Sequence, residues 1–329
     1  MTGPRLTERC GVTCTDLGAS VVAPNGKLVS VFGDTFSGRK VGQGDWRSPV
    51  VLIGAGDADH EIVYERAGGD DPNYAHQLWH YIHDDAATGW THGGISTVIP
   101  SDLLRVDDSI YLHAIVNRGF GNVVWTEIWR SDDSGISWSH MGEDAKFPAN
   151  QHGGYAQCWS WDHDPDDGWV YVVATGFQRD KGIILMRVQP EHIGQRSRYV
   201  SWGFANGRWA WGEPATPITP DGEKWGDLTF RRMAQGKWIL GGLLASKYAL
   251  GTGSWNHRSP TCTPPKSRRL CWARRGTPRI IPATRSRNST VAMCCPARGS
   301  TSRAASGWWC HSGTPTWDGL TGQCNSRRR

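Results

Sequence analysis

The composition of this 329-residue chain changes abruptly at Gly251. From residue 252 to residue 329 there is no Phe, no Tyr, two Leu and one acidic residue, whereas thirteen Arg and six of the nine Cys lie there. Before that point, short apolar runs alternate with turns rich in Gly, Asp, Asn and Pro, which is typical of β-strands. The sequence therefore predicts a β-rich domain over residues 1–251 and a low-complexity tail over residues 252–329.

One pattern, a polar turn followed by an apolar or alternating strand, recurs four times in the first part. It occupies Asn25–Asp34, Asp107–Val116, Asp166–Thr175 and Gln235–Leu244. The units start 82, 59 and 69 residues apart. Solenoid repeats are shorter and more regular, whereas four-stranded propeller blades with variable loops allow this spacing. We expect an all-β, five-bladed β-propeller with about four blades in residues 1–251, and its last part would have to come from the tail.

A second motif agrees with a propeller. The segment Ser131–Trp138 (SDDSGISW) fits the Asp-box pattern S-x-D-x-G-x-x-W. In such a hairpin turn the Ser and Asp side chains bond the turn's own backbone, Gly takes an unusual dihedral angle, and Trp packs between blades. We interpret this motif as structural.

Fourteen of the nineteen Trp lie before residue 252. Large aromatic side chains suit the gaps between stacked sheets, so we expect most of them to pack between blades. Some could instead line a carbohydrate groove. The candidates next to loop sequences are Trp46, Trp79, Trp90, Trp159 and Trp161.

Charge and motifs exclude several function classes. Fourteen basic residues and one acidic residue give the tail a net charge of +13, so the first 251 residues carry −8 of the total +5. Scattered acidic residues offer no surface for nucleic acid. No apolar run approaches the ~20 residues that span a bilayer. The N-terminal MTGPRLTERC shows no signal peptide. The localisation is left open between the cytoplasm and a start site downstream of a lost export signal.

The sequence also predicts no metal and no cofactor. The tail cysteines lack the paired C-x-x-C spacing of a zinc module, and neither a P-loop nor a dinucleotide fingerprint occurs. His76, His80 and His83 have a spacing that suits zinc only on a rigid helix, and their segment reads as a loop. The three cysteines before residue 252 do not suggest a disulfide scaffold.

The composition of the tail suggests an origin. A bias toward Arg, Pro, Ser, Thr, Cys, Trp and Ala is what a GC-rich gene yields when it is read out of frame. Our hypothesis is a frameshift near Gly251. A natural low-complexity tail is the alternative, but five Trp and six Cys are unusual in a linker.

Two acidic residues stand out near the N-terminus. Asp16 in TDLG precedes the first predicted strand, and Asp34 in FGDTF follows the second. The innermost strands of a propeller converge on a central tunnel, where two carboxyl groups could serve as acid and base, or as acid and nucleophile, in glycoside cleavage. Taken alone, an Asp at a strand end is more often a turn former.

The strings TDLG, FGDTF, GDWRSPVV, QLWHYIHDD, STVIPSDLL, GFGNVVWTEIWRSDD and GDLTFRRMAQGKWILGGLL occur in this order between about Gly11 and Gly251. This part resembles the actinobacterial endo-D-arabinanase family, glycoside hydrolase family 183. The resemblance implies a five-bladed propeller that cleaves internal α-D-arabinofuranosyl linkages of mycobacterial arabinogalactan and lipoarabinomannan. It places the essential carboxylates at Asp16 and Asp34. It also implies a secreted or envelope-associated protein. The Tyr- and Gly-rich final blade of the family has no counterpart after Gly251.

Several further residues are candidates for substrate binding. Asp45 and Arg47, which flank Trp46 in GDWRS, could orient substrate hydroxyls or could form an ion pair that holds their loop. Trp46 could pack on a sugar ring. The resemblance suggests Asp227 as a third carboxylate at the mouth of the ring, and the alternative is that it forms part of a hairpin turn. Two readings compete with an enzyme: a non-catalytic carbohydrate-binding or scaffold propeller, and a non-functional pseudogene product.

Overall fold

The computed structural model describes residues 2–56, 61–83, 94–119, 121–233 and 236–255. Within these ranges the chain forms β-strands joined by loops and short 3-10 turns, without an α-helix. The 3-10 turns are η1 (Glu8–Cys10), η3 (Glu143–Ala145), η4 (Gln151–Gly154), η5 (Pro190–His192), η6 (Arg196–Arg198) and η8 (Ala245–Lys247). The predicted tail, residues 252–329, lies outside the described residues from 256 onward.

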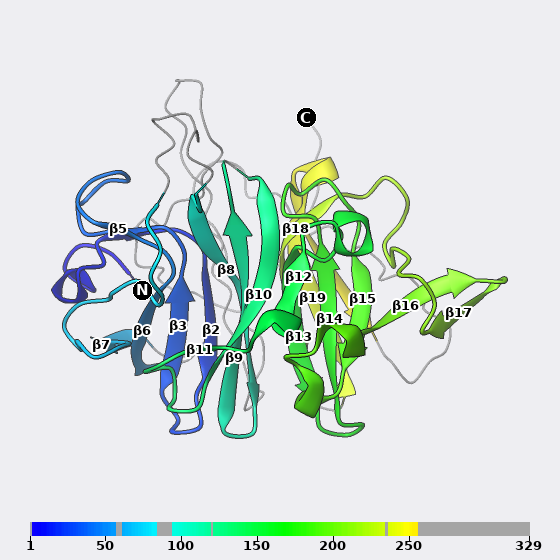
Figure 1. Cartoon of the computed structure of the whole chain (residues 1–329), viewed down its shortest axis with the longest axis horizontal. Helices are drawn as coiled ribbons and strands as arrows, with labels where there is room; N and C mark the ends of the chain where they lie inside the picture. Colours follow the sequence, from blue (N-terminus) through cyan, green and yellow to red (C-terminus); the bar gives the residue numbers. More distant parts are fainter. Residues whose placement is uncertain (1, 57–60, 84–93, 120, 234–235, 256–329) are drawn as a thin grey trace, which may run out of the picture.

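Four antiparallel sheets follow one another in sequence order and stand side by side (Figure 1). The first contains β2 (Gly18–Val22), β3 (Leu28–Phe32), β6 (Val50–Ala55) and β7 (Val63–Ala67). The second contains β8 (Thr97–Val106), β9 (Ser109–Asn117), β10 (Val123–Ser131), β11 (Ser139–His140) and β12 (Lys146–Pro148). The third contains β13 (Cys158–Asp164), β14 (Trp169–Thr175), β15 (Ile184–Val188), β16 (Val200–Ala205) and β17 (Arg208–Trp211). The fourth contains β18 (Trp225–Arg232), β19 (Trp238–Leu244) and β20 (Ala249–Trp255).

A small additional sheet lies next to the first blade. It contains β1 (Cys14–Thr15), β4 (Thr35–Phe36) and β5 (Trp46–Arg47). Because β1 and β4 extend the hairpin of β2 and β3, this sheet places residues 15 and 35 opposite each other.

The first strands of the four sheets, β2, β8, β13 and β18, contact one another in turn. Each is paired with a second strand, and these second strands (β3, β9, β14 and β19) are formed by the four repeated units of the sequence. Sheets that radiate from a central row of first strands are the blades of a β-propeller. The predicted all-β propeller fold is thus confirmed, with four blades in the described residues. The fifth blade, expected from the tail, falls outside them.

The core consists of apolar layers between successive blades. Val31 of the first blade packs with Val98 and Leu112 of the second. The two layers that follow contain the largest fully buried side chains, among them Trp159 and Trp238. Burial of such aromatic rings supplies much of the apolar area that leaves water on folding, which is why a chain built from thin sheets uses so many Trp residues.

The turn between β10 and β11 is held by its own side chains. Asp133 Oδ1 accepts hydrogen bonds from the backbone N–H groups of Ile136 and Ser137, at 3.0 and 2.9 Å. Ser131 Oγ accepts the N–H of Gly135 at 2.9 Å, and Gly135 has a φ of 90° that suits glycine. The hydrogen bonds of these side chains are made within the turn itself, as expected for a structural motif.

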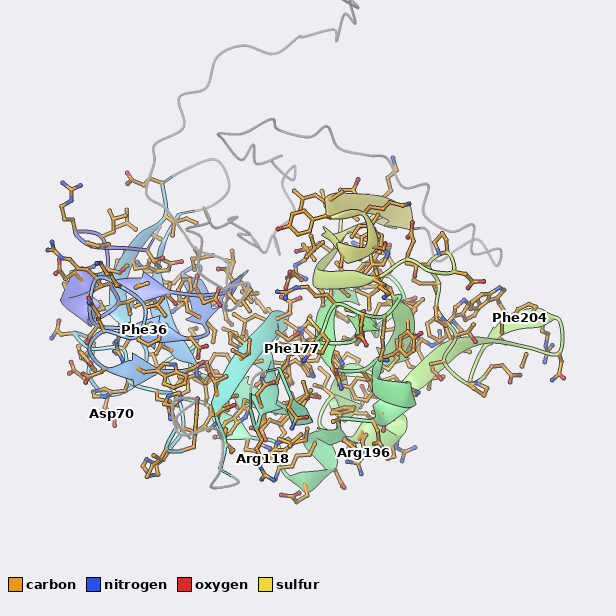
Figure 2. All side chains as sticks on the ribbon, turned by 90° about the horizontal axis from the view of Figure 1, so that it is seen from above. Phe36, Asp70, Arg118, Phe177, Arg196 and Phe204 are labelled. Atoms are coloured by element: carbon orange, nitrogen blue, oxygen red, sulfur yellow. The ribbon has the colours of Figure 1, made fainter. Side chains whose placement is uncertain are left out.

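The hairpin of β16 and β17 projects from the third blade, with the exposed Phe204 near its end (Figure 2). At its base, the guanidinium of Arg187 lies over the ring of Trp169 at 4.1 Å and over that of Trp211 at 4.3 Å. At the other end of the described chain, β20 pairs with β19 as far as Trp255, four residues beyond the change in composition at Gly251.

Candidate active site

The starts of the inner strands lie at one end of the molecule. Ser101 and Asp102 of β8 bond Trp159 and Trp161 of β13 in that order. In the same way, Ser160 and Asp162 of β13 accept the N–H groups of Phe230 and Arg232 of β18. Later residues of one strand therefore meet later residues of the next, so β8, β13 and β18 run in the same direction. The segments just before or at the start of these strands consequently share one mouth of the propeller.

Asp16 and Asp34 lie next to each other at this mouth. The N–H of Asp16 donates to the carbonyl of Asp34 at 2.9 Å, and the N–H of Gly33 donates to the carbonyl of Asp16 at 3.0 Å. The two residues flank the β2–β3 hairpin, in which Gly18 pairs with Phe32. The sequence-predicted pair is thus brought together by the hairpin itself.

The two carboxyl groups have different surroundings. Asp34 Oδ1 accepts hydrogen bonds from the indole Nε1 of Trp46 at 2.9 Å and from the hydroxyl of Thr97 at 2.5 Å. Asp16 Oδ1 accepts the backbone N–H of Leu17 at 2.8 Å. Burial raises the pKa of Asp16 to about 6, and the negative charge of Asp34 adds to this increase. The Asp16 carboxyl therefore keeps its proton up to mildly acidic pH, above the range of an ordinary aspartate.

A third carboxylate reaches the same place from the fourth blade. Asp227 of β18 lies close enough to Asp16 for its charge to raise the pKa of that carboxyl. Arg179, in the loop between β14 and β15, donates Nε and Nη2 to the two oxygens of Asp227 at 3.0 and 3.1 Å. Gly226 makes room for the arginine, because a Cβ there would lie 2.4 Å from Arg179 Cγ. Sequence reasoning missed Arg179, since no motif surrounds it.

Three non-glycine residues around this cluster have left-handed backbone conformations. Leu17 has a φ of 34°, Arg179 of 56° and Asp227 of 48°. Such conformations cost free energy for ordinary residues and concentrate at functional sites, where the surrounding structure maintains them. Each lies beside or within the group of charges around Asp16, so the chain is strained where its charged side chains converge.

The other predicted site residues lie in the loop around Trp46. The buried guanidinium of Arg47 donates to the carbonyls of Ala75 and Gly11 at 2.6 and 2.5 Å. Asp45 accepts the hydroxyl of Tyr74 at 2.6 Å. These contacts hold the loop that carries Trp46. Arg47 bonds loop carbonyls and Asp45 bonds a tyrosine, so the two residues do not form the ion pair that was the alternative for this loop.

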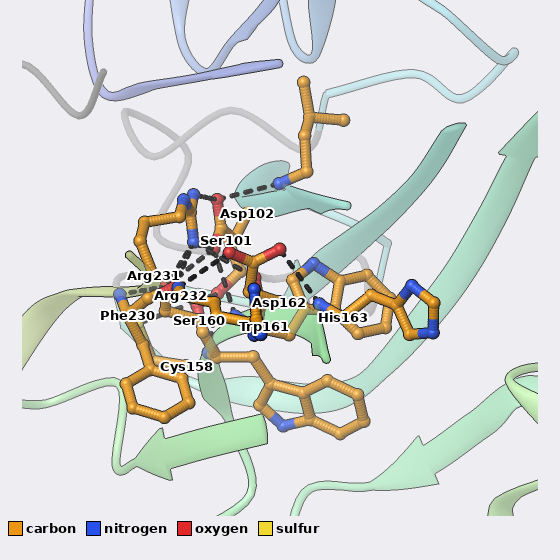
Figure 3. A network of polar contacts seen from close by, with 12 residues as sticks. Ser101, Asp102, Cys158, Ser160, Trp161, Asp162, His163, Phe230, Arg231 and Arg232 are labelled. Carbon is orange, nitrogen blue, oxygen red and sulfur yellow. Dashed lines mark hydrogen bonds and ion pairs between the residues drawn. The ribbon is translucent and has the colours of Figure 1, made fainter. Parts of the chain in front are cut away.

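Below the mouth, a buried polar network connects three inner strands (Figure 3). Arg231 donates Nη2 and Nη1 to the two oxygens of Asp102 at 2.6 and 2.8 Å, and Ser160 Oγ donates to Asp102 Oδ2 at 2.6 Å. Asp162 accepts backbone N–H groups of His163 and Arg232, and burial raises its pKa to about 6. No sequence motif marks this network, because its hydrogen-bonded partners are up to 129 residues apart.

Among the described residues, no group of three or more His, Cys, Asp or Glu is placed to hold a metal ion. Of the three histidines with metal-like spacing, His83 stacks on Trp46 with ring centroids 3.9 Å apart. The described part of the chain also contains no helix long and apolar enough to cross a membrane. Trp159 and Trp161 are buried between blades, and Trp90 lies outside the described residues.

The chain is similar to proteins of a fungus and of a mycobacterium. The chain is 31% identical over 265 residues to Notoamide biosynthesis cluster protein J' of Aspergillus versicolor, covering 77% of this chain and 71% of that one. It is 28% identical over 221 residues to an uncharacterized 35.9 kDa protein in the asd 3' region of Mycolicibacterium smegmatis, covering 64% and 61%.

Among solved structures, a "putative hydrolase" of Bacteroides ovatus shares the fold at 12% identity and a TM-score of 0.55, over 81% of this chain and 72% of that one. The sequence profile of a family described as Domain of unknown function (DUF4185) matches residues 2–292, which extends beyond Gly251. This match covers most of the 329 residues, and the chain therefore belongs to the DUF4185 family.

Proposed function

We propose that this protein is a glycoside hydrolase that cleaves internal D-arabinofuranosyl linkages of mycobacterial cell-wall arabinan. The observation that carries the proposal is the pair Asp16 and Asp34, adjacent at the mouth of the propeller and bound by different hydrogen-bond donors. The choice of substrate rests on the resemblance of the strings around these residues to endo-D-arabinanases, and a relative in a mycobacterium is consistent with it.

In this proposal Asp16 is the general acid. A carboxyl whose pKa is raised to about 6 by burial keeps its proton at mildly acidic pH and can deliver it to the leaving oxygen. Asp227 supports this role, because its negative charge disfavours ionisation of Asp16. Arg179 in turn holds Asp227 in place through two hydrogen bonds.

Asp34 is the partner of this acid. Two hydrogen bonds donated to its Oδ1, from Trp46 and Thr97, fix its orientation. Its other oxygen would either activate a water molecule or attack the anomeric carbon. The two mechanisms differ in carboxyl separation, about 5 Å for a nucleophile and about 6.5–9.5 Å for a base that acts through water.

The test is hydrolysis of purified D-arabinan by the full chain, with released reducing ends quantified and product lengths determined by mass spectrometry. Asp16→Asn and Asp34→Asn should each lower the rate about 10²–10⁴-fold, the usual contribution of a positioned acid or base. Asp70→Asn, a change at an exposed aspartate on the periphery (Figure 2), should leave it unchanged. Full activity in both site variants would refute the assignment. Binding of arabinan without hydrolysis would favour the carbohydrate-binding alternative.

The proposed frameshift has a separate test in the nucleotide sequence around codon 251. Another reading frame should encode a strand-patterned continuation with Tyr and Gly if the tail arose in this way. Other frames without strand patterning would favour a natural low-complexity tail.

A further inference from the structure

A second feature lies beside the candidate active site. A cavity of about 660 Å³ opens next to the loop of β5, and its wall is formed by residues 76–83 together with Trp46 and Arg47. Trp46 belongs to both places, because its indole N–H donates to Asp34 while its ring lines the cavity. Trp46 therefore connects the wall of the cavity to Asp34 at the mouth of the propeller.

The wall of this cavity is rigidly built. The side-chain amide of Gln77 donates to the carbonyls of Trp79 and Tyr81 at 3.1 and 3.0 Å, and its oxygen accepts the N–H of Ser48 at 3.3 Å. The hydroxyl of Tyr81 accepts the N–H of Val98 at 3.1 Å. Gln77 thus fixes the course of the wall, and Tyr81 anchors the wall to Val98 of the second blade.

Stacked aromatic pairs stand at two points along the cavity. Trp46 stacks on His83 with ring centroids 3.9 Å apart and an interplanar angle of 18°. Trp79 stacks on Trp129 of β10, also at 3.9 Å, with an angle of 5°. The indole of Trp129 is itself fixed by a hydrogen bond to the buried carboxylate of Glu127 at 3.0 Å. Trp79 is consequently held with one face of its ring flat against Trp129.

The lining of the cavity is aromatic and polar. Among the described residues that line it there are three histidines and no carboxylate, and the one guanidinium, that of Arg47, is engaged by two backbone carbonyls. Burial lowers the pKa of His83, so its ring is uncharged at neutral pH. Aromatic faces combined with hydrogen-bonding groups complement a polyhydroxylated sugar chain.

We propose that this cavity is a distal binding site for sugar residues of the same polysaccharide chain that is cleaved at Asp16 and Asp34, with Trp79 as its principal contact. The inference rests on the proposed function and extends it from the cleaved bond to its neighbours. A chain held at both places presents an internal linkage to the carboxylates. The site therefore favours long chains over short oligosaccharides.

Binding can be measured without catalysis. Electrophoresis of the full-length Asp16→Asn chain through gels containing D-arabinan reports affinity from the retardation of the band. Adding Trp79→Ala should weaken the affinity about tenfold, the scale of a central aromatic contact. Trp79→Phe, which preserves a ring against Trp129, should give an intermediate loss. Trp209→Ala, on the projecting β16–β17 hairpin, serves as the control and should change nothing.

Kinetics on the active chain supply the second readout. Trp79→Ala and Trp79→Phe should raise KM for polymeric arabinan and leave kcat/KM for a short arabinofuranosyl oligosaccharide unchanged. An unaltered melting temperature of Trp79→Phe shows that its loss is not a folding defect.

The outcomes separate the two proposals. Hydrolysis by the wild-type chain, with polymer affinity unaffected by both Trp79 variants, would overturn the distal site and leave the proposed function standing. Retardation that depends on Trp79, without hydrolysis, would overturn the proposed function and support the binding site. Equal losses for polymer and oligosaccharide would also overturn the distal site, because they would place Trp79 at the cleaved bond.

Discussion

The buried pair of Arg231 and Asp102 provides the sharpest test of what holds the inner strands together. The side chains are 9% and 4% exposed, and they share two short hydrogen bonds across 129 residues of sequence. Arg231→Met keeps an unbranched side chain but removes the cation. The carboxylates of Asp102 and Asp162 then stay buried without their positive partner, and so the native state should lose roughly 3–5 kcal/mol.

That loss is a large part of the 5–15 kcal/mol that stabilises an ordinary domain. Urea unfolding at pH 7, followed by Trp fluorescence, should show a midpoint lower by about 1 M or more, given slopes of about 1–3 kcal/mol per M. The matched control is Arg130→Met. Arg130 forms an equally short contact with Asp132, 2.7 Å, but both side chains are exposed, so about 0–1 kcal/mol should be lost.

A double variant tests the reason for the loss. Asp102→Leu combined with Arg231→Met removes both charges, and it should be clearly less destabilising than the sum of the single changes. A cost below about 1 kcal/mol for Arg231→Met would refute the reasoning. Strictly additive costs in the double variant would refute it as well, because they would mean that the two charges do not depend on each other.

Three further predictions concern single sites. His113 is fully buried, and neither ring nitrogen has a hydrogen-bond partner within the described structure, so His113→Phe should stabilise the chain by about 1–3 kcal/mol in urea unfolding. Burial lowers the pKa of His113 well below 6.5, so the unfolded state takes up a proton that the folded state does not, and this gain should widen as the pH falls below about 6.5. Asp227→Asn removes a negative neighbour of Asp16, so the basic limb of the pH–rate profile should move to lower pH. The shift should be at most about one pH unit, because burial is the main cause of the raised pKa of Asp16. An unmoved limb would contradict the proposed coupling. Gly226→Ala should displace Arg179 and lower the melting temperature, at a cost of about 1–3 kcal/mol, and an unchanged melt would show that the arginine side chain adapts freely.

The parts of the fold that depend on local sequence could be predicted. The four repeated units became the second strands because their turns and alternation specify hairpins, whatever the rest of the chain does. The adjacency of Asp16 and Asp34 is also local. The β2–β3 hairpin pairs Gly18 with Phe32, so residues just outside it on either side must meet.

The remaining features depend on how blades meet, and local sequence does not encode that. Asp227 approaches Asp16 only because the inner strands curve around a common axis, and Arg179 reaches Asp227 from another blade. Likewise, the sequence suggested Asp45 as an ion-pair partner for Arg47, but two loop carbonyls engage the guanidinium in the structure. Backbone carbonyls are present everywhere in a sequence, so their choice of partner cannot be read from residue types.

The pH dependence of kcat/KM for cleavage of purified D-arabinan tests the central claim most directly, because this profile reports the groups of the free enzyme. A general acid must be protonated, so activity should fall as the pH rises through the pKa of Asp16, at about 6. The residual activity of Asp16→Asn should lack this limb. A limb near pH 6 that persists in Asp16→Asn, or an arabinan that the intact chain does not cleave at any pH, would contradict the account.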